Sequence, residues 1–173
     1  MKRLKIYHSL SNLREGVLTK LVSLLNPMYQ FVMPRNKSWH LTKADLREFP
    51  EGTLGKGLAA FLDTNKFDIL PYLETHDVYH VLLGYKPTIV DEARLYFWLL
   101  GNGKQSIEVL STVLSGFIFL PDYWSVLMED YRRGKACRNI AHWDFQELMT
   151  KDLDILRGVI FKRIEQPFTI ATI

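Results

Sequence analysis

Three ionisable residues set on apolar helical stripes constrain the fold of this 173-residue chain. His76 and His80 are four residues apart, so their side chains leave the same side of a helix, one turn above each other. Glu92 follows in a second helical pattern after a short connection, which favours antiparallel neighbours that place Glu92 level with His80. Burying two imidazoles and a carboxylate is costly unless each is paired. The sequence therefore predicts a helix pair that joins these groups at one point.

A divalent cation would supply that pairing in one step, so we predict that His76, His80 and Glu92 are metal ligands. Asp77 lies about 100° around the helix from His76, and is either a fourth ligand or an acceptor that fixes an imidazole tautomer. Imidazole and carboxylate ligands suit zinc, iron or manganese, and the spacing does not choose among them. The absence of cysteine ligands argues against a purely structural zinc site. A buried hydrogen-bond network without a metal is the alternative.

Other motifs fit less well. The histidine pair is not His-Glu-x-x-His, because Asp77 replaces the general base of zinc proteases. Residues 52–57 resemble a phosphate loop, but no Ser or Thr follows Lys56, and we interpret them as a turn and helix start that permits close packing. A metal-dependent phosphohydrolase would need a further His and Asp, for which His40 and Asp122 are the candidates.

Helical periodicity dominates, and it predicts an all-α, single-domain helical bundle. The expected helices cover residues 10–24, 53–62, 71–84, 88–101, 106–117, 122–133 and 142–161. Residues 88–91 are expected to form a capping box, Gly134 to end a helix, and residues 28–52 to be irregular. We treat residues 1–173 as one domain, with a basic helix and irregular segment over 1–47 and the metal-site core over 48–165.

Charge is distributed unevenly. Residues 1–47 contain nine Lys or Arg and two acidic residues, a net charge of +7, whereas the remaining 126 residues carry −4. The basic segment is either a solvated surface or a surface that settles on anionic lipid. Nucleic acid is not expected, because the basic residues are not interleaved with stacking aromatic residues.

Processing and compartment signals are sparse. No apolar signal core follows Met1, and the longest apolar stretch, residues 109–121, is shorter than the roughly 20 residues that span a membrane. The one cysteine, Cys137, cannot form an internal disulfide, which favours a reducing compartment. We expect a cytoplasmic protein that is at most peripheral to the membrane, on its cytoplasmic face.

Two further segments have alternative interpretations. The basic cluster near Gly134 either stabilises a helix C-terminus or binds a phosphate or lipid headgroup; its members are Arg132, Arg133, Lys135 and Arg138. Residues 109–120 either belong to the core or line a lipid groove. As candidate acids for catalysis we identify only Tyr79 and His142.

Several of these motifs together resemble the coenzyme Q biosynthesis protein 4 family. The specific part is His76-Asp77-x-x-His80-x11-Glu92, and the supporting parts are residues 52–55, 61–63, 81–84, 87–88 and, more loosely, 131–135 and Trp143. The resemblance covers roughly residues 47–160. Residues 1–47 match poorly and the chain is short for the family, which suggests a bacterial-type member whose quinone need not be ubiquinone.

The resemblance implies an all-helical fold with a metal site, usually taken as zinc, at His76, Asp77, His80 and Glu92. It also implies a role in ubiquinone biosynthesis at the membrane surface, beside other enzymes of the pathway. The implied reaction removes the C1 carboxylate of a polyprenylated 4-hydroxy-3-methoxybenzoate, by lyase or oxidative chemistry, with the isoprenoid tail in an apolar groove. The alternative is a non-catalytic scaffold that binds isoprenoid lipid and organises these enzymes. A second copy of the chain, in a homodimer, is a further expected partner under either function.

Overall fold

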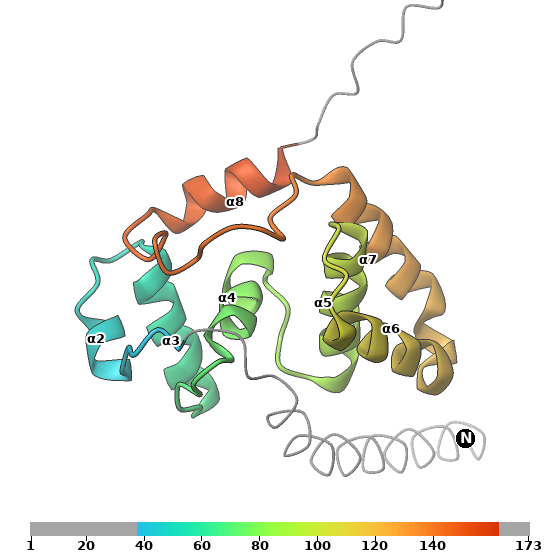
Figure 1. Ribbon diagram of the computed structural model, residues 1–173, viewed down its shortest axis with the longest axis horizontal. Coiled ribbons are helices and arrows are strands. Elements are labelled where there is room, and N and C mark those ends of the chain that lie inside the picture. Colours follow the sequence, from blue (N-terminus) through green and yellow to red (C-terminus); the bar gives the residue numbers. More distant parts are fainter. Residues whose placement is uncertain (1–37, 163–173) are drawn as a thin grey trace, which may run out of the picture. The chain divides into compact units, whose positions relative to one another are not determined.

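The computed structural model describes residues 38–162, and in this part of the chain the fold is all-α, as expected (Figure 1). The helices are α2 (Lys43–Arg47), α3 (Leu54–Asn65), α4 (Glu74–Leu83), α5 (Ile89–Gly101), α6 (Ile107–Phe119), the 3-10 turn η1 (Pro121–Tyr123), α7 (Trp124–Ala136) and α8 (Leu153–Phe161). The chain divides after Trp39 into two units, and the helices described here belong to the second. The helix expected over residues 10–24 lies outside the described residues.

Side-chain caps define where most of these helices begin. At five helix starts the N-cap side chain accepts a hydrogen bond from the third helical N–H; these residues are Thr42, Thr53, Thr88, Ser106 and Asp152. At the other end of α4, Gly84 adopts φ +77°, a left-handed conformation that glycine tolerates. The capping box expected at residues 88–91 is half formed, because the Asp91 carboxylate accepts from the Lys86 N–H instead of returning to Thr88.

Two predicted boundaries are wrong. Within the segment expected to be irregular, Thr42 and Asp45 form a complete capping box that begins α2. The helix expected over 142–161 begins only at Leu153. The backbone carbonyls of Met149 and Lys151, which a longer helix would use internally, instead accept from the first N–H groups of α3 at 2.9 Å each. Tertiary hydrogen bonds therefore keep residues 142–152 in turns.

α5 and α7 cross closely and form the most extensive contact between helices of the described bundle. A Cβ atom added at Gly101 would lie 2.0 Å from the Tyr131 carbonyl oxygen, and one at Gly134 would lie 2.0 Å from the Trp98 carbonyl oxygen. The two backbones are therefore in contact. Gly134 lies inside α7, so the prediction that it ends a helix is wrong. Asn102 ties the same crossing by donating to the carbonyl oxygens of Gly134 and Arg138.

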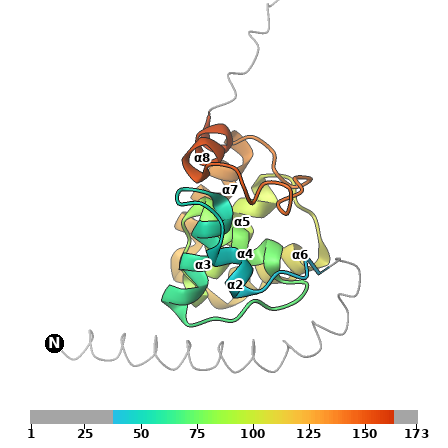
Figure 2. The same ribbon diagram turned by 90° about the vertical axis from the view of Figure 1, so that its left-hand side faces the viewer.

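α4 connects this crossing to the other helices, since it contacts α5, α3 and α8. α8 lies over α4 at one end of the bundle (Figure 2). Arg157 of α8 donates to the Val81 carbonyl oxygen at 2.8 Å. Close packing around α3 confirms our interpretation of residues 52–57, because a Cβ added at Gly55 would lie 2.5 Å from the Phe49 ring. The phosphate-loop alternative also loses its free N–H groups, which donate to the loop before α8.

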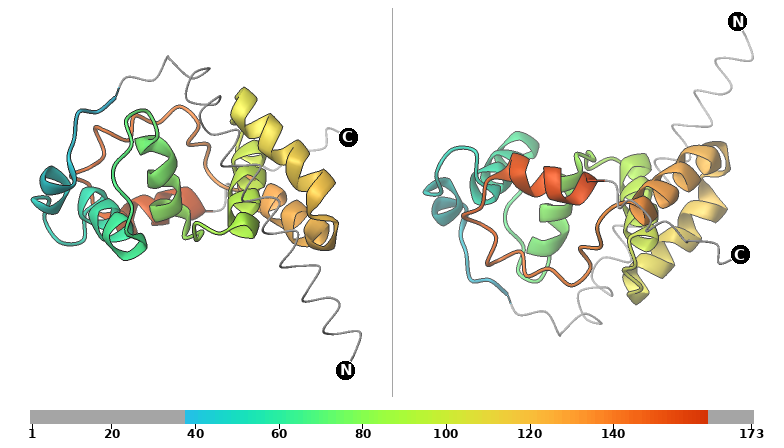
Figure 3. Two further views of the ribbon diagram at one scale, coloured as in Figure 1. Left: turned by 90° about the horizontal axis from the view of Figure 1, so that it is seen from below. Right: turned by 90° about the horizontal axis from the view of Figure 1, so that it is seen from above.

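α6 lies at the periphery, against α5 and η1 (Figure 3). Val109, Val113 and Gly116 are buried, whereas the outer face of α6 exposes Ile107, Leu110, Leu114, Phe117 and Ile118. One face of α6 therefore belongs to the core, and a lipid groove lined by residues 109–120 stays a prediction. Within residues 38–162 no single helix has the length and apolarity to cross a membrane, and α6 with η1 and α7 meets that criterion only as a pair bent by 101°.

Candidate metal centre

The structure brings His76 and His80 of α4 together with Glu92 of α5. The two Nε2 atoms lie 3.1 Å apart. Glu92 Oε1 lies 3.1 Å from His80 Nε2, and Glu92 Oε2 lies 3.4 Å from His76 Nε2. The convergence that the spacing predicts is confirmed, since one donor atom from each residue falls within 4.8 Å of the others.

His80 is fixed from behind. Its Nδ1 lies 2.9 Å from the backbone carbonyl oxygen of Tyr85, and because a carbonyl only accepts, Nδ1 carries the proton. In the neutral ring the Nε2 lone pair then faces His76 and Glu92. His80 is 3% exposed, and the Phe61 ring stacks on it with centroids 5.3 Å apart. Its orientation is therefore set by packing and by a hydrogen bond together.

His76 has an equivalent arrangement through a side chain. Its Nδ1 lies 3.3 Å from the Tyr96 hydroxyl, which donates its own proton to Glu108 Oε1 at 2.5 Å. The Tyr96 oxygen is thus left to accept from Nδ1–H of His76, and the Nε2 lone pair again faces the cluster. The Tyr96 ring also stacks against His76, with centroids 5.7 Å apart.

Two lone pairs and a carboxylate at this separation repel one another unless they share a positive charge. Without a metal, a proton on His76 would supply that charge. Burial by itself raises the pKa of Glu92. The hydrogen bonds with His76 and His80 outweigh burial and lower this pKa to about 2. Burial lowers the pKa of His76, and the hydrogen bond and charge of Glu92 outweigh it, so the net pKa is raised.

A metal ion fits the same donor set. Zinc bonds of about 2.0–2.2 Å separate neighbouring donors by roughly 3.4 Å at tetrahedral angles and roughly 2.9 Å at octahedral angles. The observed separations of 3.1, 3.1 and 3.4 Å lie in this interval. Two histidines and one carboxylate are the protein ligands of several catalytic zinc sites and of non-haem iron sites, which keep further positions open.

Asp77 lies outside the cluster formed by the three convergent residues. It is half-buried one residue after His76, and burial raises its pKa to about 6 although the histidine charges oppose this. Its role as a ligand or as an orienting acceptor stays a prediction. His40 and Asp122, the additional ligands that a phosphohydrolase would need, also lie outside the cluster within the described residues.

The basic cluster near Gly134 and the two candidate acids for catalysis are the remaining candidate residues. Arg133 pairs with buried Asp130 at 2.9 Å, whereas Arg132, Lys135 and Arg138 are exposed around the end of α7. The Tyr79 hydroxyl is buried and accepts from Lys104, and His142 is exposed in the segment before α8. Headgroup binding by the basic cluster, and acid catalysis by Tyr79 or His142, stay predictions.

Sequence reasoning missed the groups behind the two imidazoles. Tyr96 follows Glu92 by four residues, so helical spacing places it on the stripe of Glu92, but the spacing does not indicate its hydrogen bond with His76. No such signal indicates Glu108 or the Tyr85 carbonyl. The Tyr85 carbonyl lies in a loop, Glu108 lies in a helix that follows a loop, and the sequence does not specify the path of either loop.

The fold and cluster define an all-α bundle with two histidines and one carboxylate at a helix pair. A scan against protein-family models found no match, and a search of curated proteins found none either. Among solved structures, the chain is similar to the crystal structure of a candidate ubiquinone biosynthesis protein from Nostoc punctiforme. The identity is 22% and the TM-score 0.54, over 86% of this chain and 79% of the other. At this identity the similarity shows a shared fold.

Proposed function

We propose that His76, His80 and Glu92 bind a divalent cation, with zinc the first candidate and iron or manganese the alternatives. The observation that carries the proposal is the direction of the lone pairs. Both Nδ1 atoms have acceptors behind them, so both Nε2 atoms face one carboxylate. Such outer hydrogen bonds are the usual companions of metal-bound histidine.

We further propose that the chain is a metal-dependent enzyme of quinone biosynthesis that removes the C1 carboxylate of a polyprenylated hydroxybenzoate. Two things support this: the sequence resemblance to the coenzyme Q biosynthesis protein 4 family, and the fold shared with a candidate ubiquinone biosynthesis protein. The other proposed partners follow from the same function, namely further enzymes of the pathway and a membrane surface that delivers the prenylated substrate.

The reaction breaks the ring carbon–carboxylate bond, leaves its electron pair on the ring, and replaces CO2 by a proton. A bound cation would supply a Lewis acid and a template that holds the substrate through its oxygen atoms. The protein holds the cation through His76, His80 and Glu92. The Phe61 ring stacks on His80 and the Tyr96 ring stacks on His76, and Glu108 keeps the Tyr96 hydroxyl turned so that its oxygen faces His76.

Substitution of the ligands tests this function. We expect His76→Ala and Glu92→Gln to lose bound metal, measured by elemental analysis, together with release of CO2 from a short-chain prenylated hydroxybenzoate. Glu129→Gln, an exposed site on α7, is the matched control and should retain both. Turnover that persists in a metal-free variant would contradict the proposal.

The outer face of α6 favours a second candidate, the isoprenoid-binding scaffold. Large apolar side chains are 49% exposed at Leu110, 62% at Leu114 and 61% at Ile118, and contiguous exposed apolar surface marks protein or membrane interaction sites. Such a face suits a lipid surface. Protein that co-purifies with isoprenoid, but releases no CO2 in air or with added oxidant, would favour the scaffold over the enzyme.

A further inference from the structure

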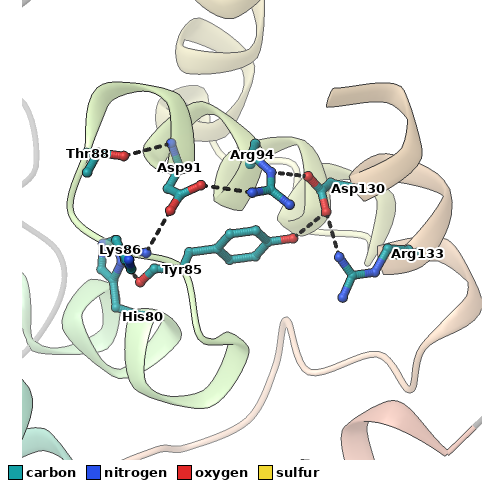
Figure 4. A network of polar contacts seen from close by, with 8 residues as sticks. All are labelled: His80, Tyr85, Lys86, Thr88, Asp91, Arg94, Asp130 and Arg133. Carbon is teal, nitrogen blue, oxygen red and sulfur yellow. Dashed lines mark hydrogen bonds and ion pairs between the residues drawn. The ribbon is translucent and has the colours of Figure 1, made fainter. Parts of the chain in front are cut away.

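A closed ring of polar contacts lies behind His80, and it begins at one peptide group (Figure 4). The peptide between Tyr85 and Lys86 is engaged on both sides. Its carbonyl oxygen accepts from His80 Nδ1 at 2.9 Å, and its N–H donates to Asp91 Oδ2 at 3.2 Å. The position of this peptide therefore decides where the His80 proton lies.

The ring continues through α5 and α7 and returns to the residue at which it starts. Asp91 Oδ1 accepts from Arg94 Nη1 at 2.9 Å, and Arg94 Nε donates to Asp130 Oδ2 at 2.7 Å. Asp130 Oδ1 then accepts from the Tyr85 hydroxyl at 2.7 Å. Tyr85 is thus held at both its backbone and its side chain, with the Arg94 guanidinium 5.3 Å from the centre of its ring.

Burial makes this ring costly to open. Asp130 is 1% exposed and Tyr85 7% exposed. A buried carboxylate that loses a donor is left with an uncompensated charge, so the remaining groups hold one arrangement. Arg133 also donates to Asp130 Oδ1, at 2.9 Å, but its side chain is half exposed and forms no link of the ring.

We propose that this ring is the positioning device of the metal centre. Tyr85, Asp91, Arg94 and Asp130 clamp one peptide, and the clamped carbonyl keeps the proton of His80 on Nδ1 and the ligand atom Nε2 open. None of the four touches the cluster through its side chain; they act through the backbone that His80 contacts. The inference rests on the metal site proposed above. The competing view is that the ring only joins α5 to α7.

The test compares two variants that open the ring with one that does not. Tyr85→Phe removes the hydroxyl, and Asp91→Ala frees the Lys86 N–H. Arg133→Met removes a donor from the same Asp130 oxygen as Tyr85→Phe does, so it is the matched control. A cooperative unfolding transition, measured on each metal-free variant, establishes that the variant folds.

The decisive readout is the tautomer of His80, measured from imidazole nitrogen-15 shifts in metal-free protein at pH 8. We expect the Nδ1–H form in wild type and Arg133→Met, and a mixture with the Nε2–H form in Tyr85→Phe and Asp91→Ala. Zinc affinity should fall about tenfold in the same two variants, as for other outer partners of metal-bound histidine. The double variant with Tyr85→Phe and Asp91→Ala should bind zinc no more weakly than the weaker-binding single variant, because one substitution already opens the ring.

If His80 keeps the wild-type tautomer in both ring-opening variants, the proposal that the ring positions His80 is wrong, whatever the zinc affinity. An equal change in Arg133→Met would overturn it too, since general damage around Asp130 would then explain the effect. Wild-type protein without zinc affinity would overturn the proposed function instead, and the tautomer comparison would still decide the clamp.

Discussion

At the residue scale, the chemistry of the two histidines depends on what lies behind each ring. A backbone carbonyl fixes His80, and a tyrosine hydroxyl committed to Glu108 fixes His76. The sequence predicts the three convergent residues, because helical spacing and a short connection determine their geometry. It does not predict their outer partners, which are a loop carbonyl for His80 and, for His76, the hydroxyl of Tyr96 on α5, held by Glu108 of α6. A one-dimensional pattern contains no information on where a carbonyl points.

Protonation of His76 in the metal-free protein leads to a prediction at this scale. The pKa of His76 is raised above 6.5, so its contribution to the stability of the metal-free protein is complete below pH 6.5 and lost as the pH rises through the raised value. Glu92, with its pKa lowered from 4.5 to about 2, contributes above pH 4.5 and loses this contribution as the pH falls toward 2. Metal-free protein should therefore lose stability above pH 6.5, measured by urea unfolding.

Metal binding should show the opposite trend in the same interval, because the cation displaces the His76 proton. We expect the zinc dissociation constant to fall by about tenfold per pH unit while His76 is protonated. Calorimetry in buffers of different ionisation enthalpy should detect about one proton released per ion. Zinc binding without proton release would contradict the protonated cluster.

At the scale of elements, the crossing of α5 and α7 depends on two glycines. Gly134 shows the limit of sequence reasoning, because a glycine that ends a helix and a glycine that admits another backbone look alike in one sequence. Periodicity located α5, α6 and α7 because their apolar stripes are long. It failed for residues 142–152, where α3 and not the local sequence takes up the carbonyl groups.

Gly134→Ala tests this crossing. The added methyl would lie 2.0 Å from the Trp98 carbonyl oxygen, so the two helices must move apart, and we expect a loss of about 3 kcal/mol or more in the free energy of unfolding. Gly158→Ala in α8 is the control, because no atom lies within 4 Å of the new methyl group. Helix propensity should make that variant more stable by about 0.5–1 kcal/mol. Equal stability of the two variants would refute a close backbone contact.

The outer face of α6 provides a second test at this scale. Ile118 is 61% exposed on α6, and Ile155 is 67% exposed on α8, so both isoleucines can be changed without disturbing the core. If α6 contacts lipid, Ile118→Lys should weaken sedimentation with anionic vesicles by at least about tenfold, because burying an isoleucine contributes roughly 1.5–3 kcal/mol. Ile155→Lys should bind as wild type does. Equal binding by both variants would exclude the α6 face.

At the scale of the whole molecule, the described fold places the cluster where α4 and α5 meet, supported from α3, α6 and α7. Phe61 comes from α3, Glu108 from α6 and Asp130 from α7. The all-α class follows from periodicity, whereas this convergence of five helices depends on loops whose geometry tertiary contacts determine. The cluster therefore belongs to the assembled bundle and not to the helix pair alone.

Anomalous diffraction from crystals grown with zinc tests the proposed metal centre itself. We expect one strong peak within about 2.3 Å of His76 Nε2, His80 Nε2 and a Glu92 carboxylate oxygen, lost in Glu92→Gln. Ordered His76 and His80 rings in hydrogen-bond contact with Glu92, with no anomalous peak between them at saturating zinc, would contradict it.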